Sequence, residues 1–204
     1  SETVLSIDTA EGDRRWSTTT DWPVIHGPAV DGETVYVAGG GLSALAADTG
    51  DQRWSVSAVQ PLTAPVLDGD TVYVQTADEG VVALATNGGG VNWRYTAGEA
   101  TASRPAVDTN TVYVGRGATI HAVDAETGEQ VWRAPADTEI RSAPAVTGGT
   151  VYVGTEAGTV LAVDADTGGE RWRVETGSPI RSAPGPASGS ITVGCRDGTV
   201  LTLE

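Results

Sequence analysis

A stretch made of a small residue, an apolar residue, Asp, a tight turn and Trp recurs along this chain. Clear copies run from Ala122 to Trp132 and from Ala162 to Trp172, and looser copies end at Trp16, Trp54 and Trp93. These five tryptophans lie 38, 39, 39 and 40 residues apart. A fixed period of about 40 residues is typical of repeated units that bury their apolar faces against one another. We therefore expect an array of such units.

Each complete unit contains four short apolar segments separated by turn residues, and no segment has the 3.6-residue apolar period of a helix. Pairs such as Asp31-Gly32 and Asp68-Gly69 favour tight hairpins between the first two segments. The first segments surround Pro28, Pro65, Pro105, Pro144 and Pro184. Four antiparallel strands in about 40 residues are typical of a propeller blade. The sequence predicts an all-β fold, a β-propeller of five four-stranded antiparallel blades.

We expect a single domain over residues 1–204. The predicted blades are residues 21–58, 59–97, 98–136, 137–176, and 177–204 together with 1–20. The fifth unit stops before its fourth strand, and we expect the N-terminal strand that carries Trp16 to complete it and close the ring. Residues 3–8, however, repeat the third strand that residues 198–203 already supply. Either the composite blade has an extra strand, or the chain is a piece of a larger ring.

The chain is strongly acidic, with 27 Asp and Glu residues against 12 basic residues and a net charge of −15. This charge repels nucleic acid and anionic lipid, because phosphate binding needs clustered cations. All the basic residues are Arg, and Lys is absent. Such a composition resembles the proteins of extremely halophilic archaea, in which molar salt screens self-repulsion. We expect no nucleic-acid partner and, because no apolar run is long enough, no membrane span.

The pattern of a small residue, an apolar residue, Asp, two residues, Thr-Gly, three residues and Trp, preceded by Val-Tyr-Val-Gly and Gly-Thr-Val, resembles the PQQ-like repeat. That repeat builds quinoprotein alcohol dehydrogenases and the BamB-like lipoprotein subunit of the bacterial outer-membrane barrel assembly machine. The resemblance is strongest from Thr111 to Trp172, whereas Ala46 and Ala85 stand at the place of the Asp. It implies a propeller and is specific for the blade rather than for an activity.

The Trp and Gly that the repeats share are predicted to be structural. An indole can fill the gap between blades and donate its N–H to a backbone carbonyl. We assign this structural role to Trp16, Trp54, Trp93, Trp132 and Trp172, and to the turn glycines Gly50, Gly89, Gly128 and Gly168. In quinoprotein dehydrogenases the quinone lies on the propeller axis near calcium, a stacking Trp and, in many, a disulfide of adjacent cysteines. The chain has one cysteine, Cys195, and one Trp outside the repeat, Trp22. We therefore expect no cofactor, and PQQ is the alternative.

Ligand-binding candidates come from aligning the units on their first prolines. Three positions before the proline stand Arg141 and Arg181 in the fourth and fifth units, and Arg104 is nearby in register. Two positions before it, His26 heads a column that otherwise carries small hydroxyl residues. Paired arginines can bind a carboxylate or phosphate bidentately. The alternative is that they pair with local acids such as Glu139 and Glu175, since Arg is normally paired.

A metal site is not expected. Residues 164–168 read Asp-Ala-Asp-Thr-Gly and begin like a calcium loop, but the distal ligands of such a loop are missing. Cys195 is expected to fill a small slot in the core, and His121, beside apolar residues on a third strand, to be a packed or edge histidine.

These observations predict a non-catalytic binding or scaffold propeller that takes a protein partner or small ligand at its face. Loops on a rigid scaffold are the usual place for such binding. A PQQ-dependent dehydrogenase, or a fragment of one, is the first alternative, and a small-anion or carbohydrate sensor is the second. We favour an extracytoplasmic or cell-surface location, with the cytoplasm of a halophile as the alternative.

Overall fold

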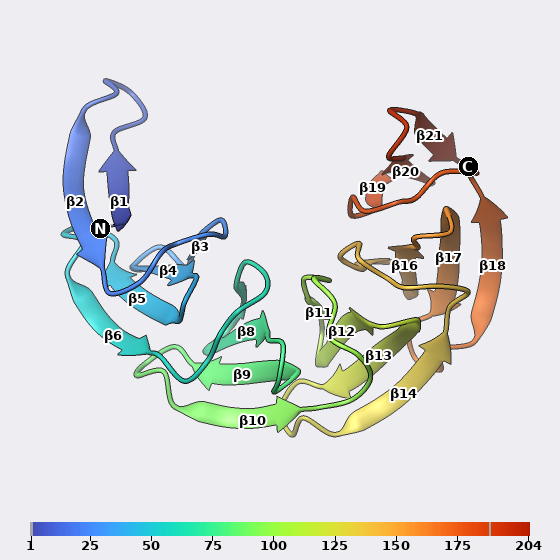
Figure 1. Cartoon of the computed structure of the whole chain (residues 1–204), viewed down its shortest axis with the longest axis horizontal. Helices are drawn as coiled ribbons and strands as arrows, with labels where there is room; N and C mark the ends of the chain where they lie inside the picture. Colours follow the sequence, from blue (N-terminus) through green and yellow to red (C-terminus); the bar gives the residue numbers. More distant parts are fainter. Residues whose placement is uncertain (1, 188) are drawn as a thin grey trace. The chain divides into compact units, whose positions relative to one another are not determined.

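The computed structural model describes residues 2–187 and 189–204 (Figure 1). These residues form strands and turns, and none of them lies in a helix. The chain divides into two compact units, described separately below. Unit 1 comprises residues 1–77 and 81–93, and unit 2 comprises residues 78–80 and 94–204. The strands pair antiparallel, as β4 does with β5 and β12 with β13, and each sheet follows the order of the chain, as the sequence predicted for propeller blades.

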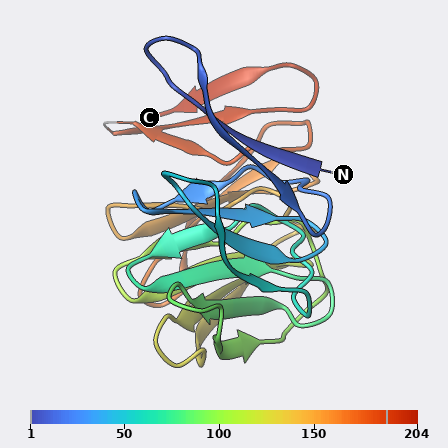
Figure 2. The same cartoon turned by 90° about the vertical axis from the view of Figure 1, so that its left-hand side faces the viewer.

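Unit 1 contains a two-stranded sheet, one complete four-stranded sheet and most of a second. The two-stranded sheet is β1 (Glu2–Ile7) and β2 (Arg14–Thr20), which Figure 2 shows as one long hairpin. The first complete sheet is β3 (Ala29–Val30), β4 (Thr34–Ala38), β5 (Leu42–Ala46) and β6 (Gln52–Val56). The second is β7 (Val66–Asp68), β8 (Thr71–Gln75), β9 (Val81–Ala85) and β10 (Val91–Tyr95), whose last two residues belong to unit 2.

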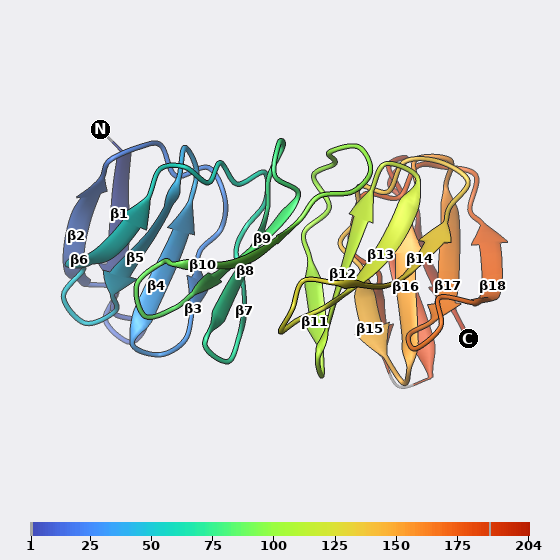
Figure 3. The same cartoon turned by 90° about the horizontal axis from the view of Figure 1, so that it is seen from below.

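Unit 2 contains two four-stranded sheets and one sheet of three described strands. The first is β11 (Ala106–Asp108), β12 (Thr111–Arg116), β13 (Thr119–Asp124) and β14 (Gln130–Pro135). The second is β15 (Ala145–Thr147), β16 (Thr150–Gly154), β17 (Thr159–Asp164) and β18 (Glu170–Glu175), seen side by side in Figure 3. The third is β19 (Gly185–Ala187), β20 (Ser190–Gly194) and β21 (Val200–Leu203).

A row of three side chains crosses the complete sheets. In β12, β13 and β14, Tyr113 pairs with Ala122, and Ala122 pairs with Trp132. Because alanine is small, the rings on either side approach each other, and their centroids lie 5.8 Å apart. The same ring pair occurs as Tyr36–Trp54, Tyr73–Trp93 and Tyr152–Trp172. The tyrosine is thus as much a part of the blade as the tryptophan that the sequence pattern singled out.

Apolar clusters fill the space between consecutive sheets within each unit. In unit 1, Leu42 of β5 packs with Val82 and Leu84 of β9. In unit 2, Ile120 of β13 packs with Leu161 of β17. A further cluster joins β17 to the last sheet. The middle strands are therefore buried on both faces, as expected for sheets that only their neighbours cover.

The indole of one sheet closes over the turn glycine of the next. A Cβ placed on Gly168, whose φ is +70°, would lie 2.5 Å from a ring carbon of Trp132. The indole N–H of Trp132 also donates to the carbonyl oxygen of Ala165 at 2.8 Å. The same two contacts occur between Trp16 and Gly50 with Ala47, and between Trp54 and Gly89 with Thr86. Each of these three indoles therefore connects its own sheet to the turn of the next.

Two details of the strand prediction need correction or stay open. The first strands begin one residue after the prolines rather than around them, as at Pro105 and Pro144, since proline has no N–H to give to a ladder. Closure of the last blade by the strand of Trp16 is not confirmed, because β2 pairs with β1. That closure and the single domain over 1–204 stay predictions, and Ser1 and Ser188 lie outside the described residues.

Candidate functional site

The predicted arginines belong to a small charged cluster at one edge of unit 2. We define the arginine cluster as Arg141, Arg181 and Arg196 together with Glu139 and Glu156. Arg181 grips Glu156 as a fork, with Nε donating to Oε1 at 2.7 Å and Nη2 donating to Oε2 at 3.0 Å. Arg141 is bonded to Glu139 at 3.1 Å, and its Nε lies 3.6 Å from Oε1 of Glu156. One glutamate therefore connects two arginines from equivalent places in consecutive sheets.

Glu156 is the electrostatic centre of the arginine cluster. Hydrogen bonds from Arg181 are the main cause that lowers the pKa of the Glu156 carboxyl, and the charges of Arg181, Arg141 and Arg196 lower it further against partial burial. The same contact raises the pKa of Arg181. Both bonded arginine side chains remain more than 40% exposed. Exposed ion pairs contribute little to stability, so these bonds can exchange for bonds to a ligand.

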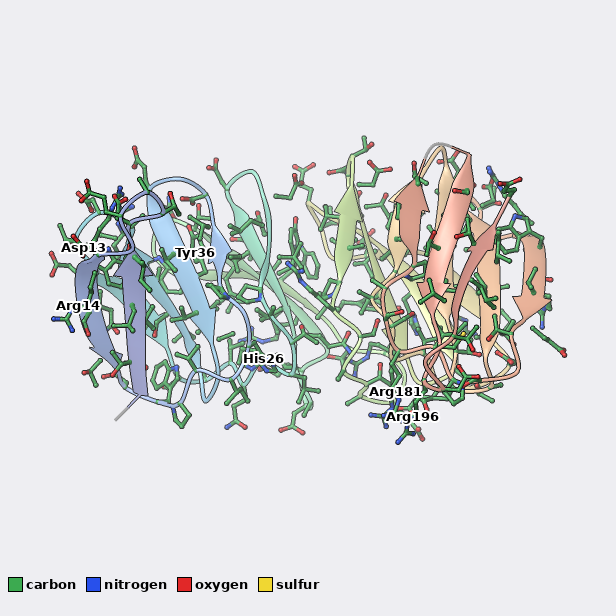
Figure 4. All side chains as sticks on the ribbon, turned by 90° about the horizontal axis from the view of Figure 1, so that it is seen from above. Asp13, Arg14, His26, Tyr36, Arg181 and Arg196 are labelled. Atoms are coloured by element: carbon green, nitrogen blue, oxygen red, sulfur yellow. The ribbon has the colours of Figure 1, made fainter. Side chains whose placement is uncertain are left out.

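The prediction that local acids pair with the arginines is confirmed for Glu139. The second acid is Glu156 rather than Glu175, which lies opposite Thr159 at the end of β18. Sequence reasoning also missed Arg196. A signal for both was present in the repeat. Thr155 and Cys195 hold equivalent places, each in an isolated bridge to an isoleucine, and Glu156 and Arg196 directly follow them. Figure 4 shows Arg181 and Arg196 side by side at one edge of the strands.

The hydroxyl column next to the arginines has a structural role. The hydroxyl of Ser142 donates to the carbonyl of Gly154 and accepts the N–H of the same residue, at 3.1 and 2.8 Å. Ser182 makes the equivalent pair of bonds with Gly194. These bonds attach the segment before each first strand to the second strand. Each serine therefore fixes the backbone of the arginine that precedes it.

His26 and Arg104 are placed differently from Arg141 and Arg181. His26 lies in unit 1, half-buried, with Nε2 3.2 Å from the carbonyl oxygen of Pro61. Arg104 lies in unit 2 with an exposed side chain. Their predicted part in a ligand site stays a prediction.

Unit 2 contains a buried group of polar side chains around His121, of which the sequence had indicated only the histidine. The hydroxyl of Tyr95 donates to Oε1 of Gln130 at 2.8 Å and so accepts the Nδ1–H of His121 at 2.9 Å. Nε2 of His121 and Nη1 of Arg116 are buried and have no hydrogen-bond partner among the described residues. Burial first, then the charges of Arg116 and Arg133, lower the pKa of His121 to about 4. The packed histidine of the sequence prediction is thus a neutral one.

The acidic stretch at Asp164 caps its own turn. Its Oδ1 accepts the N–H groups of Asp166 and Thr167 and the hydroxyl of Thr167, and its Oδ2 accepts a bond from Arg171 at 2.7 Å. The Arg171 bond is the main reason that the pKa of Asp164 falls to about 2. Within residues 2–187 and 189–204 no three His, Cys, Asp or Glu side chains gather closely enough to hold a metal ion. Cys195 is buried in the cluster of the last sheet.

Comparison with known families decides what kind of chain this is. The PQQ_2 family profile, described as outer membrane protein assembly factor BamB, matches residues 1–118 and, in a second overlapping match, residues 79–204. The chain belongs to this family. It is a BamB-like β-propeller protein built from PQQ-like repeats, as the sequence resemblance implied. No curated protein matches the chain.

Two solved structures show the same architecture as this BamB-like chain. BamB from Moraxella catarrhalis is 25% identical with a TM-score of 0.82, and the match covers 94% of this chain and 64% of that one. The computationally designed Ika8 protein is 18% identical with a TM-score of 0.86, covering 98% of this chain and 64% of the designed one. The chain thus spans less than two thirds of the length of either protein. No described helix is long and apolar enough to cross a membrane.

Proposed function

We propose that this chain is a non-catalytic binding scaffold, in which rigid blades present variable side chains to a protein partner. Membership of a family described as an assembly factor supports this proposal. The observation that carries it is the pairing of a fixed serine with an exposed arginine. Ser142 and Ser182 are bonded into the sheet, whereas the adjacent Arg141 and Arg181 extend into solvent. The repeat keeps the backbone constant while the displayed residue differs between units.

The arginine cluster suits a partner segment that carries carboxylates. Three guanidinium groups and two carboxylates give the cluster a net charge of +1, in a chain whose total is −15. Arginine binds carboxylates through two parallel N–H bonds, and Arg181 already holds Glu156 in this way. A partner's glutamate or aspartate can replace Glu156 on Arg181 with the same geometry. Glu156 then acts as an internal competitor that limits affinity.

The one tryptophan outside the repeat also favours a scaffold over quinone chemistry. The ring of Trp22 lies directly against Gly40 and Gly41, and a Cβ on Gly41 would be 2.4 Å from it. The ring therefore packs against the turn between β4 and β5, in the first complete sheet of unit 1. It is therefore a poor candidate for the stacking tryptophan of the alternative, a PQQ-dependent dehydrogenase.

Fluorescence anisotropy with a labelled oligoglutamate peptide tests this proposal. Arg141→Ala/Arg181→Ala should weaken binding at least tenfold, whereas Glu156→Gln should strengthen it because the competitor is gone. Arg173→Ala is the matched control, since this exposed arginine pairs with Glu170 on β18, outside the cluster. A labelled oligolysine peptide should show no dependence on Arg141 and Arg181. Equal binding of oligoglutamate by the wild type and the double variant would contradict the proposal.

A small anion is the second candidate ligand. The charges of three arginines already act on one small anionic group, the carboxylate of Glu156. Calorimetric titration with inorganic phosphate distinguishes it from the peptide. Saturable heat that disappears in Arg141→Ala/Arg181→Ala would favour an anion sensor. Peptide binding without phosphate binding would favour the protein scaffold.

A further inference from the structure

Two buried side chains of unit 2, Arg116 and His121, have polar atoms without partners. Arg116 is 2% exposed and His121 is 3% exposed. Among the described residues, Nη1 of the arginine and Nε2 of the histidine have no hydrogen-bond partner. Burying a polar atom without a hydrogen bond is costly, and a guanidinium also carries a permanent positive charge. Both nitrogens are therefore candidates to bind a further group.

The strand register places these two side chains on one face of their sheet. Val114 pairs with His121, and Arg116 lies two residues after Val114 in β12. Alternate residues of a strand, and residues paired across two strands, share a face. Arg133 of β14 also pairs with His121 and belongs to this face, but its side chain is exposed. Arginine and histidine are thus diagonal neighbours on adjacent strands, and all these strands lie within unit 2.

One short segment of unit 2 covers both unpartnered nitrogens. A Cβ placed on Gly98 would lie 3.5 Å from Nε2 of His121 and 3.3 Å from Cβ of Arg116. Nε of Arg116 donates to the carbonyl oxygen of Ala97, so the guanidinium ends beside the same segment. Gly98 itself is exposed. The imidazole nitrogen and the guanidinium therefore converge below a single layer of backbone.

The repeat does not need this pair in order to fold. In the following sheet, Thr155 takes the place of Arg116 and Leu161 takes the place of His121. The hydroxyl of Thr155 accepts the N–H of Thr159 at 3.2 Å, within its own hairpin. Apolar packing and local hydrogen bonds are thus sufficient at these two places. The buried arginine and histidine are an addition that one blade carries.

The charge of Arg116 indicates which chemical class the site would take. Its Nε bonds to a neutral carbonyl, and the side chain that acts on its charge is Tyr95. Arg133 brings a second positive charge to His121, and Glu99, next to Gly98, is exposed. An anion would balance the buried charge. Two N–H groups suit an anion of one atom, because each buried oxygen of a phosphate that lacked a donor would cost free energy.

We propose that Nη1 of Arg116 and Nε2 of His121 bind one halide ion. Nε2 must then donate, so the imidazole takes its Nε2–H tautomer and Nδ1 becomes an acceptor. One proton leaves Nδ1 for water and another reaches Nε2 from water, so the imidazole stays neutral. The halide therefore balances the charge of Arg116 alone.

Tyr95 and Gln130 allow this change of tautomer without the loss of a hydrogen bond. The hydroxyl of Tyr95 lies 2.9 Å from Nδ1 of His121 and 2.8 Å from the amide of Gln130. Without the halide, Nδ1–H donates to Tyr95, and Tyr95 donates to Gln130. With the halide, Tyr95 donates to Nδ1, and the rotated amide of Gln130 donates to Tyr95. The hydroxyl is thus able to serve both tautomers in one position.

NMR of the imidazole nitrogens tests the site in the intact chain. Long-range proton–nitrogen spectra of the chain with ¹⁵N-labelled histidine distinguish the two tautomers. In sodium gluconate, which has a large organic anion, His121 should be the Nδ1–H tautomer. Replacing gluconate with bromide at constant ionic strength should convert it to the Nε2–H tautomer with saturation. The chain has two histidines, and His26 in unit 1 should show no such conversion.

Three variants separate this site from the arginine cluster and from general effects of charge. Arg116→Met should weaken the response of His121 to bromide at least tenfold. Arg173→Gln removes an equal charge from an exposed position of β18 and should leave the response unchanged. Arg141→Ala/Arg181→Ala should leave it unchanged as well. This double variant abolishes peptide binding under the proposed scaffold function, so the two proposals can fail independently.

A wild-type crystal grown in sodium bromide provides a test that does not depend on how a variant folds. An anomalous bromine peak should lie within hydrogen-bonding distance of Nη1 of Arg116 and Nε2 of His121. An ordered water there without an anomalous peak would overturn the proposal. A bromide in the crystal with no change of tautomer in solution would be an adventitious ion only and would equally overturn it. So would a response of Arg116→Met equal to that of the wild type.

Discussion

Trp132 and Tyr113 share one acceptor in the neighbouring sheet. The indole N–H of Trp132 reaches the carbonyl oxygen of Ala165 at 2.8 Å, and the hydroxyl of Tyr113 reaches the same oxygen at 3.2 Å. Both side chains are more than 90% buried. Two donors from two strands of one blade thus converge on a single backbone group of the next, which makes their contributions to stability interdependent.

Removing both donors should cost more than the sum of the single losses. Trp132→Phe and Tyr113→Phe each leave the carbonyl of Ala165 one donor, whereas the double variant leaves it buried and unpaired. We expect a coupling free energy of about 1 kcal/mol in urea unfolding, because an unsatisfied buried carbonyl costs roughly 1–3 kcal/mol.

The first complete sheet of unit 1 supplies the matched control for this cycle. There Trp54 donates to the carbonyl of Thr86, but the hydroxyl of Tyr36 donates to Asp31 instead. Trp54→Phe and Tyr36→Phe should therefore be additive within error. Equal coupling in the two sheets would show that ring contact, and not the shared acceptor, is the cause.

Gly168→Ala should destabilise the chain more than Gly177→Ala. Both glycines have positive φ, +70° and +81°, so an alanine at either site carries a backbone cost of about 1–2 kcal/mol. Only at Gly168 would the new methyl also meet the indole of Trp132, whereas nothing lies within 4 Å at Gly177. We expect a further loss of about 1–3 kcal/mol from overpacking, measured as the difference between the two urea midpoints. Equal losses would mean that the indole moves aside freely.

Stability should fall on mild acidification because of His121. Its folded pKa of about 4 lies below the usual 6.5, so the unfolded chain takes up the proton first. Above pH 6.5 His121 is neutral in both states and does not reduce the free energy of unfolding. As pH falls from 6.5 towards 4, only the unfolded chain is protonated, so the free energy of unfolding falls by about 2–3 kcal/mol. In His121→Gln, the free energy of unfolding measured in urea should change less with pH over this window than it does in the wild type. Parallel curves would place the cause in the carboxylates instead.

The chain should show no quinone chemistry. Titration of PQQ with calcium should leave its absorbance spectrum unshifted, and no quinone-dependent dye reduction should follow addition of an alcohol. A red shift with tight binding would support a dehydrogenase and contradict the scaffold proposal. Trp22→Phe is the informative variant in that event, because it would show whether the unrepeated indole takes part.

The repeat made the blades predictable, while the partners of individual charges were not. Trp132 and Gly168 stand at fixed places in a pattern, and the gap between two sheets leaves an indole few alternatives to the turn glycine. Glu156, by contrast, meets Arg181 because a turn after β16 and a segment before β19 reach the same edge, which only the packing of two sheets decides. The Tyr95–His121 bond depends in the same way on how the end of β10 lies against β13. Strand periodicity contains no information about either contact.

The indole-to-carbonyl bonds have a consequence for how this chain reaches its fold. They join residues only 31, 32 and 33 positions apart, so each forms as soon as two successive blades meet. Most all-β proteins fold slowly because they must first close long loops. Here a pair of adjacent blades within either unit can nucleate, and further blades then add one at a time. Amide hydrogens of β6 and β18, whose residues are partly exposed, should then exchange earlier than those of the buried strands β5 and β17.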